Sequence, residues 1–247
     1  MNDVIREYYL IDHSGGFIKR ACENGCVNLL MYLHRIKTAI PNDAIACASR
    51  NGHLPAVEYL CSIGVDPTID DGRAQILASS YGHLDVVKYL HSIGANPSAG
   101  NNASFFAACN HGHIPVVEYL YSVGADPKAD GNSAIRWASM KGHLHVVEYL
   151  CKVGVDPATG NNDPIVWASS HGHLDVVKYL HSIGADPTAG NNQPIRWASA
   201  HGHLSIVEYL YSVGADPTAN NNSAIKMAIR EGHNHVVEYL RMIGATD

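Results

Sequence analysis

Histidine is the residue type that first suggests chemistry, because the chain of 247 residues contains 16 of them. Many stand in His-x-His pairs, and imidazoles are common ligands of zinc and other transition metals. The pairs are His111/His113, His143/His145, His171/His173, His201/His203 and His233/His235. One histidine of each pair follows a glycine and recurs every 30 residues along the chain, which indicates a structural role. We therefore expect no resident metal and no cofactor.

Cysteine offers a second set of reactive groups, with six residues in the chain: Cys22, Cys26, Cys47, Cys61, Cys109 and Cys151. No pair of C-x-x-C motifs occurs, so a zinc site built from cysteines is not indicated. Cys61 and Cys151 stand three repeats apart, roughly 30 Å at the usual helix-packing distance, which is too far for a disulfide. Reduced thiols and a polar start without a signal peptide indicate an intracellular protein.

Catalysis, nucleic-acid binding and membrane insertion lack their usual signatures. Combinations such as Ser170, His171 and Asp175 recur with the repeat, and neither a glycine-rich phosphate loop nor an isolated carboxylate pair occurs, so we expect no enzyme. The net charge is −6 and no run of Lys and Arg occurs, which disfavours nucleic acid as a partner. No apolar stretch approaches the roughly 18 residues of a membrane span.

The elements that position these side chains follow from the 30-residue repeat itself. A fixed period of this size is typical of stacked-repeat architectures. In the copy that begins at Gly202, Leu204, Val207 and Leu210 follow helical spacing and predict a short amphipathic helix. Gly214 is expected to end this helix, because glycine readily adopts the left-handed conformation found there.

Another helix precedes this one in each repeat, over residues 193–201 in the same copy, with Ile195 and Ala198 as its apolar positions. Helix N-caps are expected at Asp43, Ser133, Asp163 and Ser223, and prolines at the first helical position at Pro164 and Pro194. Pairs that tolerate positive φ separate the repeats: Asp71-Gly72, Asn101-Asn102, Gly131-Asn132, Asn161-Asn162, Asn191-Asn192 and Asn221-Asn222. Each repeat is therefore predicted as helix, short loop, helix and tight turn, and it must stack on its neighbours.

The stretch 194–204, followed by Val207, Leu210 and Gly214-Ala215-Asp216, resembles the ankyrin repeat. That family's pattern runs T-P-L-H-x-A-A-x-x-G-H, then apolar positions, then G-A-D. The resemblance implies an all-α solenoid of stacked helix-turn-helix units. The family's usual period is about 33 residues, and the three residues missing here fall where the family places a β-hairpin, so we expect shortened hairpin turns. This trimmed form also resembles the ankyrin arrays of giant DNA viruses.

The resemblance extends over nearly the whole chain and predicts its domain organisation. Residues 1–16 are expected to form an N-terminal half-repeat cap, because Val4, Ile5 and Tyr8 suggest a second helix that lacks its first. Residues 17–247 are expected to form one ankyrin-repeat domain. A degenerate unit covers 17–40, and about seven 30-residue repeats cover 41–247.

Aromatic residues recur at two positions of the repeat. Trp137, Trp167 and Trp197 share one position of the first helix, and its equivalents are apolar: Cys47, Leu77, Ala107 and Met227. This favours packing between repeats over the alternative, an exposed aromatic ladder. The recurring tyrosines, from Tyr59 to Tyr239, are predicted to be structural, with hydroxyls at the edge of the stack. A three-repeat period in the sequence Cys61, His91, Tyr121, Cys151, His181, Tyr211 is interpreted as the trace of a duplication.

Candidate binding residues are those that vary while the scaffold recurs. In ankyrin arrays the inner groove is formed by the ends of the first helices and by the turns, and the two positions before each Gly-His map there. The predicted partner-binding residues are Arg50, Asn51, Tyr81, His111, Met140, Lys141, His171 and His201, together with Arg136 and Arg196 on the preceding turn. The basic residues suit an acidic or phosphorylated partner segment. Neutral variation on a solvated face is the alternative.

The resemblance implies a non-catalytic protein–protein interaction module that binds another protein through its concave face. If the viral resemblance holds, the partner is a host protein. The chain is expected to be a monomer. The alternative is a structural or self-associating scaffold component, which would need an exposed apolar end face, and the charged residues Arg230, Glu231 and Arg241 in the last repeat disfavour it.

Overall fold

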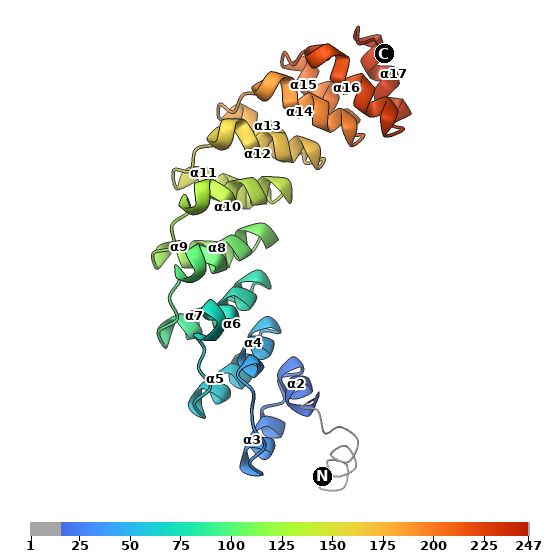
Figure 1. Ribbon diagram of the computed structural model, residues 1–247. Coiled ribbons are helices and arrows are strands. Elements are labelled where there is room, and N and C mark those ends of the chain that lie inside the picture. The colour runs from blue at the N-terminus through green and yellow to red at the C-terminus, as the bar shows by residue number, and fades with distance from the viewer. Residues whose placement is uncertain (1–15, 247) are drawn as a thin grey trace. The chain divides into compact units, whose positions relative to one another are not determined.

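The computed structural model describes residues 16–246, and every regular element within them is an α-helix (Figure 1). By internal contacts, these residues form two compact units. The N-terminal unit contains the described residues up to Ala108 together with Pro115–Ala125, and the C-terminal unit contains Cys109–Ile114 and the residues from Asp126 onward. The half-repeat cap expected at 1–16 lies outside the described residues, apart from Gly16 in the first helix.

The N-terminal unit consists of helix pairs joined by short loops. The pairs are α2 (Gly16–Glu23) with α3 (Val27–Arg35), α4 (Asp43–Arg50) with α5 (Leu54–Ser62), and α6 (Ile69–Ser80) with α7 (Leu84–Ser92). The boundary between the units falls within α8 (Ala99–His111) and α9 (Ile114–Ser122). In the N-terminal unit α2, α4 and α6 pack in one layer, and α3, α5 and α7 pack in a second layer (Figure 1).

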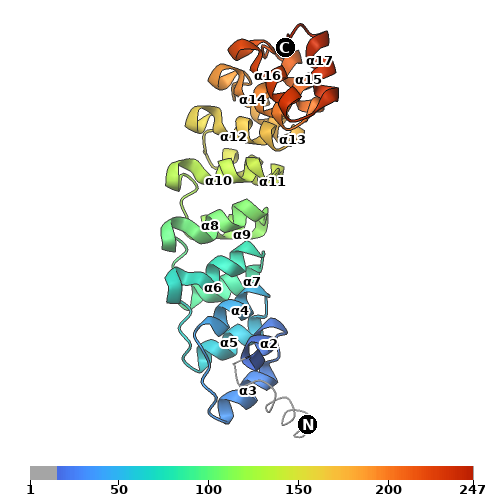
Figure 2. The ribbon, with the colours of Figure 1, turned by 45° about the vertical axis from the view of Figure 1, so that its right-hand side comes forward.

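The C-terminal unit repeats this arrangement four times. Its pairs are α10 (Ala129–Met140) with α11 (Leu144–Lys152), α12 (Thr159–Ser170) with α13 (Leu174–Ser182), α14 (Ala189–Ala200) with α15 (Leu204–Ser212), and α16 (Ala219–Arg230) with α17 (Asn234–Met242). The first helices of the pairs form one layer and the second helices form the other (Figure 2). The predicted all-α fold of stacked helix-turn-helix units is confirmed.

The core lies between the two layers and is built from the apolar positions of the repeat. Ile165, Ala168 and Leu180 are fully buried, as are their counterparts one repeat later. Alanine on the first helix lets neighbouring helices approach closely, while leucine on the second helix fills the space between layers. Burying one such leucine contributes about 2 kcal/mol, so each short helix owes its stability to the stack.

The Gly-His motif that recurs once per repeat is explained by a contact between successive repeats. Gly142 has φ +74°, and a Cβ atom built there would lie 2.3 Å from the His173 ring nitrogen Nδ1. The other ring nitrogen of His173, Nε2, donates a hydrogen bond to the carbonyl oxygen of Met140 at 3.0 Å. Equivalent bonds join His53 to Glu23, His83 to Arg50, His143 to Asn110 and His203 to Ser170. The predicted structural role of these histidines is confirmed, and each one fastens its repeat to the preceding repeat.

The turns between repeats contain three left-handed residues instead of the two that the sequence suggests. Gly160, Asn161 and Asn162 have φ of 61°, 60° and 67°, and the corresponding triplets in the other repeats behave alike. The Asn162 side-chain oxygen accepts a hydrogen bond from the Asp186 amide at 2.8 Å, so the turn also anchors the next repeat. Asparagine and glycine suit this conformation because their left-handed forms cost little.

The expected side-chain N-caps are not formed where the sequence places them. The N-cap of α4 is Asn42, one residue before the predicted Asp43, and it makes no side-chain cap bond. The Ser133 hydroxyl donates instead to the Asp130 carbonyl oxygen at 2.7 Å. Asp130, Gly131 and Asn132, which precede Ser133, are left-handed, so the Ser133 side chain bonds back into this turn instead of capping the helix.

The recurring tyrosines fasten neighbouring second helices together. The Tyr119 hydroxyl is hydrogen-bonded to His91 Nδ1 at 2.7 Å, and the Lys88 ammonium lies 5.6 Å from the centroid of the Tyr119 ring. Tyr209 meets His181 and Lys178 in the same way, at 2.7 and 5.5 Å. The three-repeat period therefore has a physical counterpart, because lysine and histidine of one helix meet one tyrosine of the next repeat.

Candidate functional site

Eight of the ten candidate binding residues lie at the C-terminal ends of the first helices, where each helix meets the loop that carries the Gly-His motif, and Arg136 and Arg196 lie about one helical turn earlier. In each unit, some of them border a hollow between neighbouring first helices. The two hollows differ in their lining and are described separately.

The hollow of the N-terminal unit has a volume of about 540 Å³ and lies beside α2, α4 and α6. Its lining residues are Lys19, Glu23, Asp43, Ala46, Cys47, Arg50, Asn51, Arg73, Leu77 and Tyr81. The Arg50 guanidinium lies 5.0 Å from the centre of the Tyr81 ring, and that tyrosine is 46% exposed. Three of the ten predicted site residues, Arg50, Asn51 and Tyr81, are thus brought together here.

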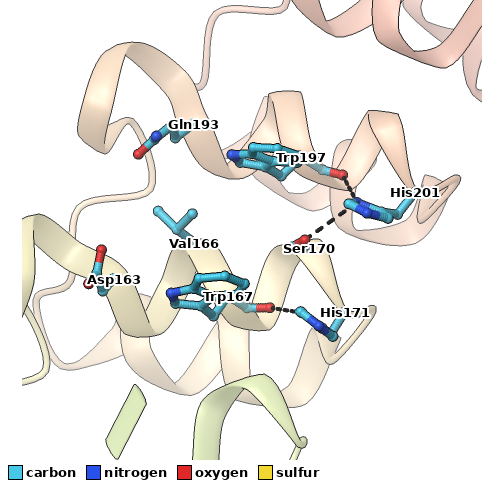
Figure 3. A pocket seen from close by; sticks show the side chains of 8 residues that line it. All are labelled: Asp163, Val166, Trp167, Ser170, His171, Gln193, Trp197 and His201. Atoms are coloured by element: carbon cyan, nitrogen blue, oxygen red, sulfur yellow. Dashed lines mark hydrogen bonds between the residues drawn. The ribbon is translucent and has the colours of Figure 1, made fainter. Parts of the chain in front are cut away.

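The hollow of the C-terminal unit has a volume of about 430 Å³ and lies between α12 and α14 (Figure 3). Its lining residues are Asp163, Val166, Trp167, Ser170, His171, Gln193, Trp197 and His201. Trp167 and Trp197 come from equivalent positions of successive repeats. The two predicted site residues His171 and His201 lie at one end of the hollow, and Asp163 and Gln193 lie at the other (Figure 3).

Each tryptophan of this hollow is paired with the histidine one helical turn later. His171 Nδ1 donates to the Trp167 carbonyl oxygen at 3.0 Å, and His201 Nδ1 donates to the Trp197 carbonyl oxygen at 2.9 Å. In both pairs the ring centroids are 5.8 Å apart. The hydrogen bond assigns the proton to Nδ1 in the neutral imidazole, so Nε2 keeps its lone pair and can accept a hydrogen bond.

The prediction that the tryptophans pack between repeats is wrong, and the exposed aromatic ladder is the observed arrangement. Trp137 is 42% exposed, and Trp167 and Trp197 are each 39% exposed. The buried face of α12 is already filled by Ile165 and Ala168, so position 167 is directed outward. The sequence held a signal for this, because residues 167 and 171 share a helix face and 171 was predicted to lie at the surface.

The two arginines predicted beside the groove occupy spaces between first helices. Arg136 Nη1 lies 3.6 Å from Asp163 Oδ2, and Arg136 Nη2 donates to the Ser133 hydroxyl at 2.9 Å. Arg196 Nε donates to the Ser223 hydroxyl at 3.2 Å. Arg136 therefore bridges α10 to α12, and Arg196 bridges α14 to α16.

The remaining predicted residues do not line either hollow. Lys141 is an exposed residue at the C-cap of α10, and Met140 contributes its carbonyl oxygen to the His173 bond. His111 stacks on His113, with ring centroids 6.4 Å apart. The ten predicted residues are divided between two units, and their role in binding a partner stays a prediction.

Two histidines of the C-terminal unit have a lowered pKa. Burial lowers the pKa of His143, and the nearby His111, His113 and His173 lower it further, while the hydrogen bond to Asn110 acts in the opposite direction. Burial likewise lowers the pKa of His203, with contributions from His201 and two other histidines.

The described part of the chain shows no group of three or more His, Cys, Asp or Glu side chains placed to hold a metal ion. Between residues 16 and 246, no helix has both the length and the apolar character needed to cross a membrane. All six cysteines, which lie within this range, are free.

Comparisons with known proteins agree with the geometry. The family model described as ankyrin repeats (3 copies) matches residues 18–101, 104–191 and 165–246. The chain is similar to the crystal structure of the human ASB11 ankyrin repeat domain, with a TM-score of 0.68 and 23% sequence identity. That similarity covers 79% of this chain and 96% of the other, and at this identity it concerns the fold alone. A comparison with curated protein sequences gives no significant match.

Proposed function

Because the chain belongs to the ankyrin-repeat family, we propose that it is a non-catalytic module that binds another protein through the exposed ends of its first helices. Ankyrin repeats are generally protein–protein interaction modules. The observation that carries the proposal is the pair Trp167 and Trp197, two large aromatic side chains that face a hollow instead of the core.

Exposed tryptophan supports binding for a physical reason. Its large ring is costly to leave in water and gains free energy when a partner covers it, and tryptophan is enriched among the residues that dominate binding energy. A hollow beside the two rings also allows a partner side chain to insert, which a flat surface does not allow. The scaffold holds both rings on helices, so little order is lost on binding.

The same proposal includes the location of the protein, the source of its partner, its domain organisation and its oligomeric state. Six free cysteines support a location inside the cell, where thiols stay reduced. The resemblance of the trimmed repeat to the ankyrin arrays of giant DNA viruses suggests a host protein as the partner. We also propose that residues 17–247 act as one repeat domain and that the chain is a monomer.

The test is a comparative capture experiment with wild-type protein and a four-site variant, Trp167→Ala, Trp197→Ala, His171→Ala and His201→Ala. Lysates from candidate host cells are passed over wild type, this variant and a control variant, and bound proteins are identified by mass spectrometry. Ile183→Ala serves as a matched control, because Ile183 is also exposed but lies after α13, in the layer of second helices. Circular dichroism must first show that all three proteins have equal helix content and similar melting temperatures.

The proposal requires a protein that wild type and Ile183→Ala retain and the four-site variant loses. Equal retention by all three proteins would remove the C-terminal hollow from the proposed function. Retention by none would count against a binding module of this kind.

A second candidate function is self-association, and it rests on one observation. Met242 is 73% exposed and Ile229 is 43% exposed, so the last described repeat presents apolar side chains despite its charged residues. Light scattering across a range of concentrations tests this candidate. A constant monomer mass would remove it, and a dimer that Met242→Ser dissociates would support it.

A further inference from the structure

We propose that the hollow between α12 and α14 accepts an acidic, proline-rich segment of the partner in the polyproline II conformation, an inference that rests on the proposed function. Four features of the C-terminal unit carry it. They are the gap at Val166, the spacing of the tryptophans, the unused indole donors and the charges on both sides of the hollow.

The hollow exists because of one small side chain. Position 166 is equivalent to Arg136 one repeat earlier and to Arg196 one repeat later. Those arginines extend across to the next first helix, where they bond Asp163 and Ser223. Val166 is buried and has no long side chain to span the space toward α14, so the gap stays open between the two indoles.

The tryptophan row has the period of a polyproline II helix. Trp137, Trp167 and Trp197 occur once per repeat, and successive packed helices lie about 10 Å apart. A polyproline II helix has three residues per turn and a rise of about 3.1 Å, so every third residue recurs after about 9 Å on one side. A β-strand presents a residue to the same face about every 7 Å and does not match this spacing.

The indole N–H groups distinguish this ligand from an α-helical one. Neither Trp167 nor Trp197 donates its indole N–H to another residue in the part of the chain that the structure describes. Figure 3 shows both nitrogens at the ring end nearer Asp163 and Gln193. A polyproline II segment has no internal hydrogen bonds, so its carbonyl groups can accept from these donors. A helix satisfies its own carbonyl groups and cannot use them.

The charges on this layer favour an acidic segment. The helices α10, α12, α14 and α16, with the residue after each, carry five cations and three carboxylates, although the chain as a whole carries −6. The cations are Arg136, Lys141, Arg196, Lys226 and Arg230, and the carboxylates are Asp130, Asp163 and Glu231. Ion pairs join Arg136 to Asp163 and Arg230 to Glu231. The cationic Arg196 lies directly beyond the hollow and forms no ion pair with a described residue, so an acidic group one turn from the inserted proline would be attracted to it.

The experiment is a selection from a random peptide library displayed on phage, with wild-type protein as bait and Val166→Arg as the counter-selection protein. The counter-selection variant closes the hollow with the residue that two other repeats already carry at this position, so it is expected to fold. Ile183→Ala is the positive control and should retain every selected peptide.

The expected result is a set of peptides with prolines three residues apart and acidic residues one turn beyond them. Binding of a synthetic member of the set should shift the fluorescence of the three tryptophans, all of which lie in this row. Trp197→Ala should weaken its affinity by about thirtyfold, the scale of a binding hot spot. Arg196→Gln should weaken it by less and should reduce its dependence on salt.

The inference and the proposed function can fail separately. Peptides without the proline spacing, or with helical or basic sequences, that still depend on Val166 would overturn the polyproline inference and leave the binding function supported. A selection in which no peptide distinguishes wild type from Val166→Arg would overturn the inference. Partner capture that depends on the tryptophans would then still support the proposed function.

Discussion

The hollow of the N-terminal unit and the hollow of the C-terminal unit are lined by the same positions of the repeat, four repeats apart. Cys47 corresponds to Trp167 and Leu77 to Trp197, while Tyr81 corresponds to His201. The N-terminal hollow adds Lys19 and Glu23 from α2. The two hollows therefore use equivalent positions of the repeat, but the side chains at those positions differ in chemistry.

This difference shows which part of the repeat is scaffold and which part is available for recognition. The Gly-His contact, the left-handed turns and the buried alanines recur in both units and hold each first helix in place. The lining residues contribute little to that framework, so they can change from Cys and Leu to Trp without altering the stack. The N-terminal hollow is charged, whereas the C-terminal hollow presents aromatic rings. We therefore expect the two hollows to prefer different ligands.

The largest expected effect comes from breaking the framework that both hollows share. Gly142→Ala forces a Cβ atom to within 2.3 Å of the His173 ring at a backbone φ of +74°. We expect a loss of about 2–4 kcal/mol in the free energy of unfolding, measured by urea denaturation.

Gly232→Ala is the matched control for this prediction, because that residue holds the same position in the last described repeat with φ +78° but has no atom within 4 Å of the added Cβ. The difference between the two variants isolates the contact with His173. An equal loss in the free energy of unfolding in both variants would mean that the contact with histidine does not explain why the Gly-His motif recurs.

The next largest effect comes from making the C-terminal hollow resemble the N-terminal one. Trp167→Leu combined with Trp197→Leu should lower the affinity for the ligand of that hollow by about tenfold or more. The melting temperature should change little, because both rings are about two-fifths exposed. Titration calorimetry and thermal melting measure the two quantities.

The reciprocal variant, Cys47→Trp with Leu77→Trp, tests the other half of the comparison. It is expected to fold, since both positions are only half-buried. Unfolding of this variant would show that the N-terminal unit cannot accommodate tryptophan at these two positions.

A smaller effect is expected from pH in the C-terminal unit. The pKa values of His143 and His203 are lowered in the folded state, so folding favours their neutral forms. The stabilisation is complete above the ordinary pKa of about 6.5 and is lost as the pH falls through the lower folded-state values. We expect the free energy of unfolding to fall by less than about 1 kcal/mol in total, because both imidazole rings are partly solvated.

Urea denaturation at pH 7.5 and pH 5.0 measures this loss. The double variant His143→Gln and His203→Gln should show a smaller difference between the two pH values than wild type. An equal difference would assign the pH dependence to other groups.

The smallest effect concerns the charged lining of the N-terminal hollow. Arg50→Gln removes the cation that lies 5.0 Å from the centre of the Tyr81 ring. We expect the free energy of unfolding to fall by about 0.5–1 kcal/mol, the usual value for such a contact at an exposed site. Arg73→Gln is the control, because Arg73 lines the same hollow but forms no ion pair or ring contact with any residue that the structure describes. Urea denaturation measures the loss in both variants, and an equal loss would mean that the contact of Arg50 with Tyr81 contributes nothing to stability.

The sequence by itself determined the repeat, its two helices and the identity of the core, because these depend on periodicity and on residues that every copy shares. Leu210 and Ile195 were identifiable as buried because a helical stripe has only one face that can meet a neighbour. The helix ends followed from glycine, whose left-handed conformation is a local property.

Only the tertiary structure decided which side of the first helix faces outward and what each recurring residue contacts. Trp167 occupies a position whose equivalents are all apolar, so the sequence favoured burial, yet the stack leaves that position at the surface. The gap at Val166 depends on the absence of a side chain that Arg136 and Arg196 supply elsewhere. Such features arise between repeats, from pairs of residues about 30 positions apart, and local periodicity cannot reveal them.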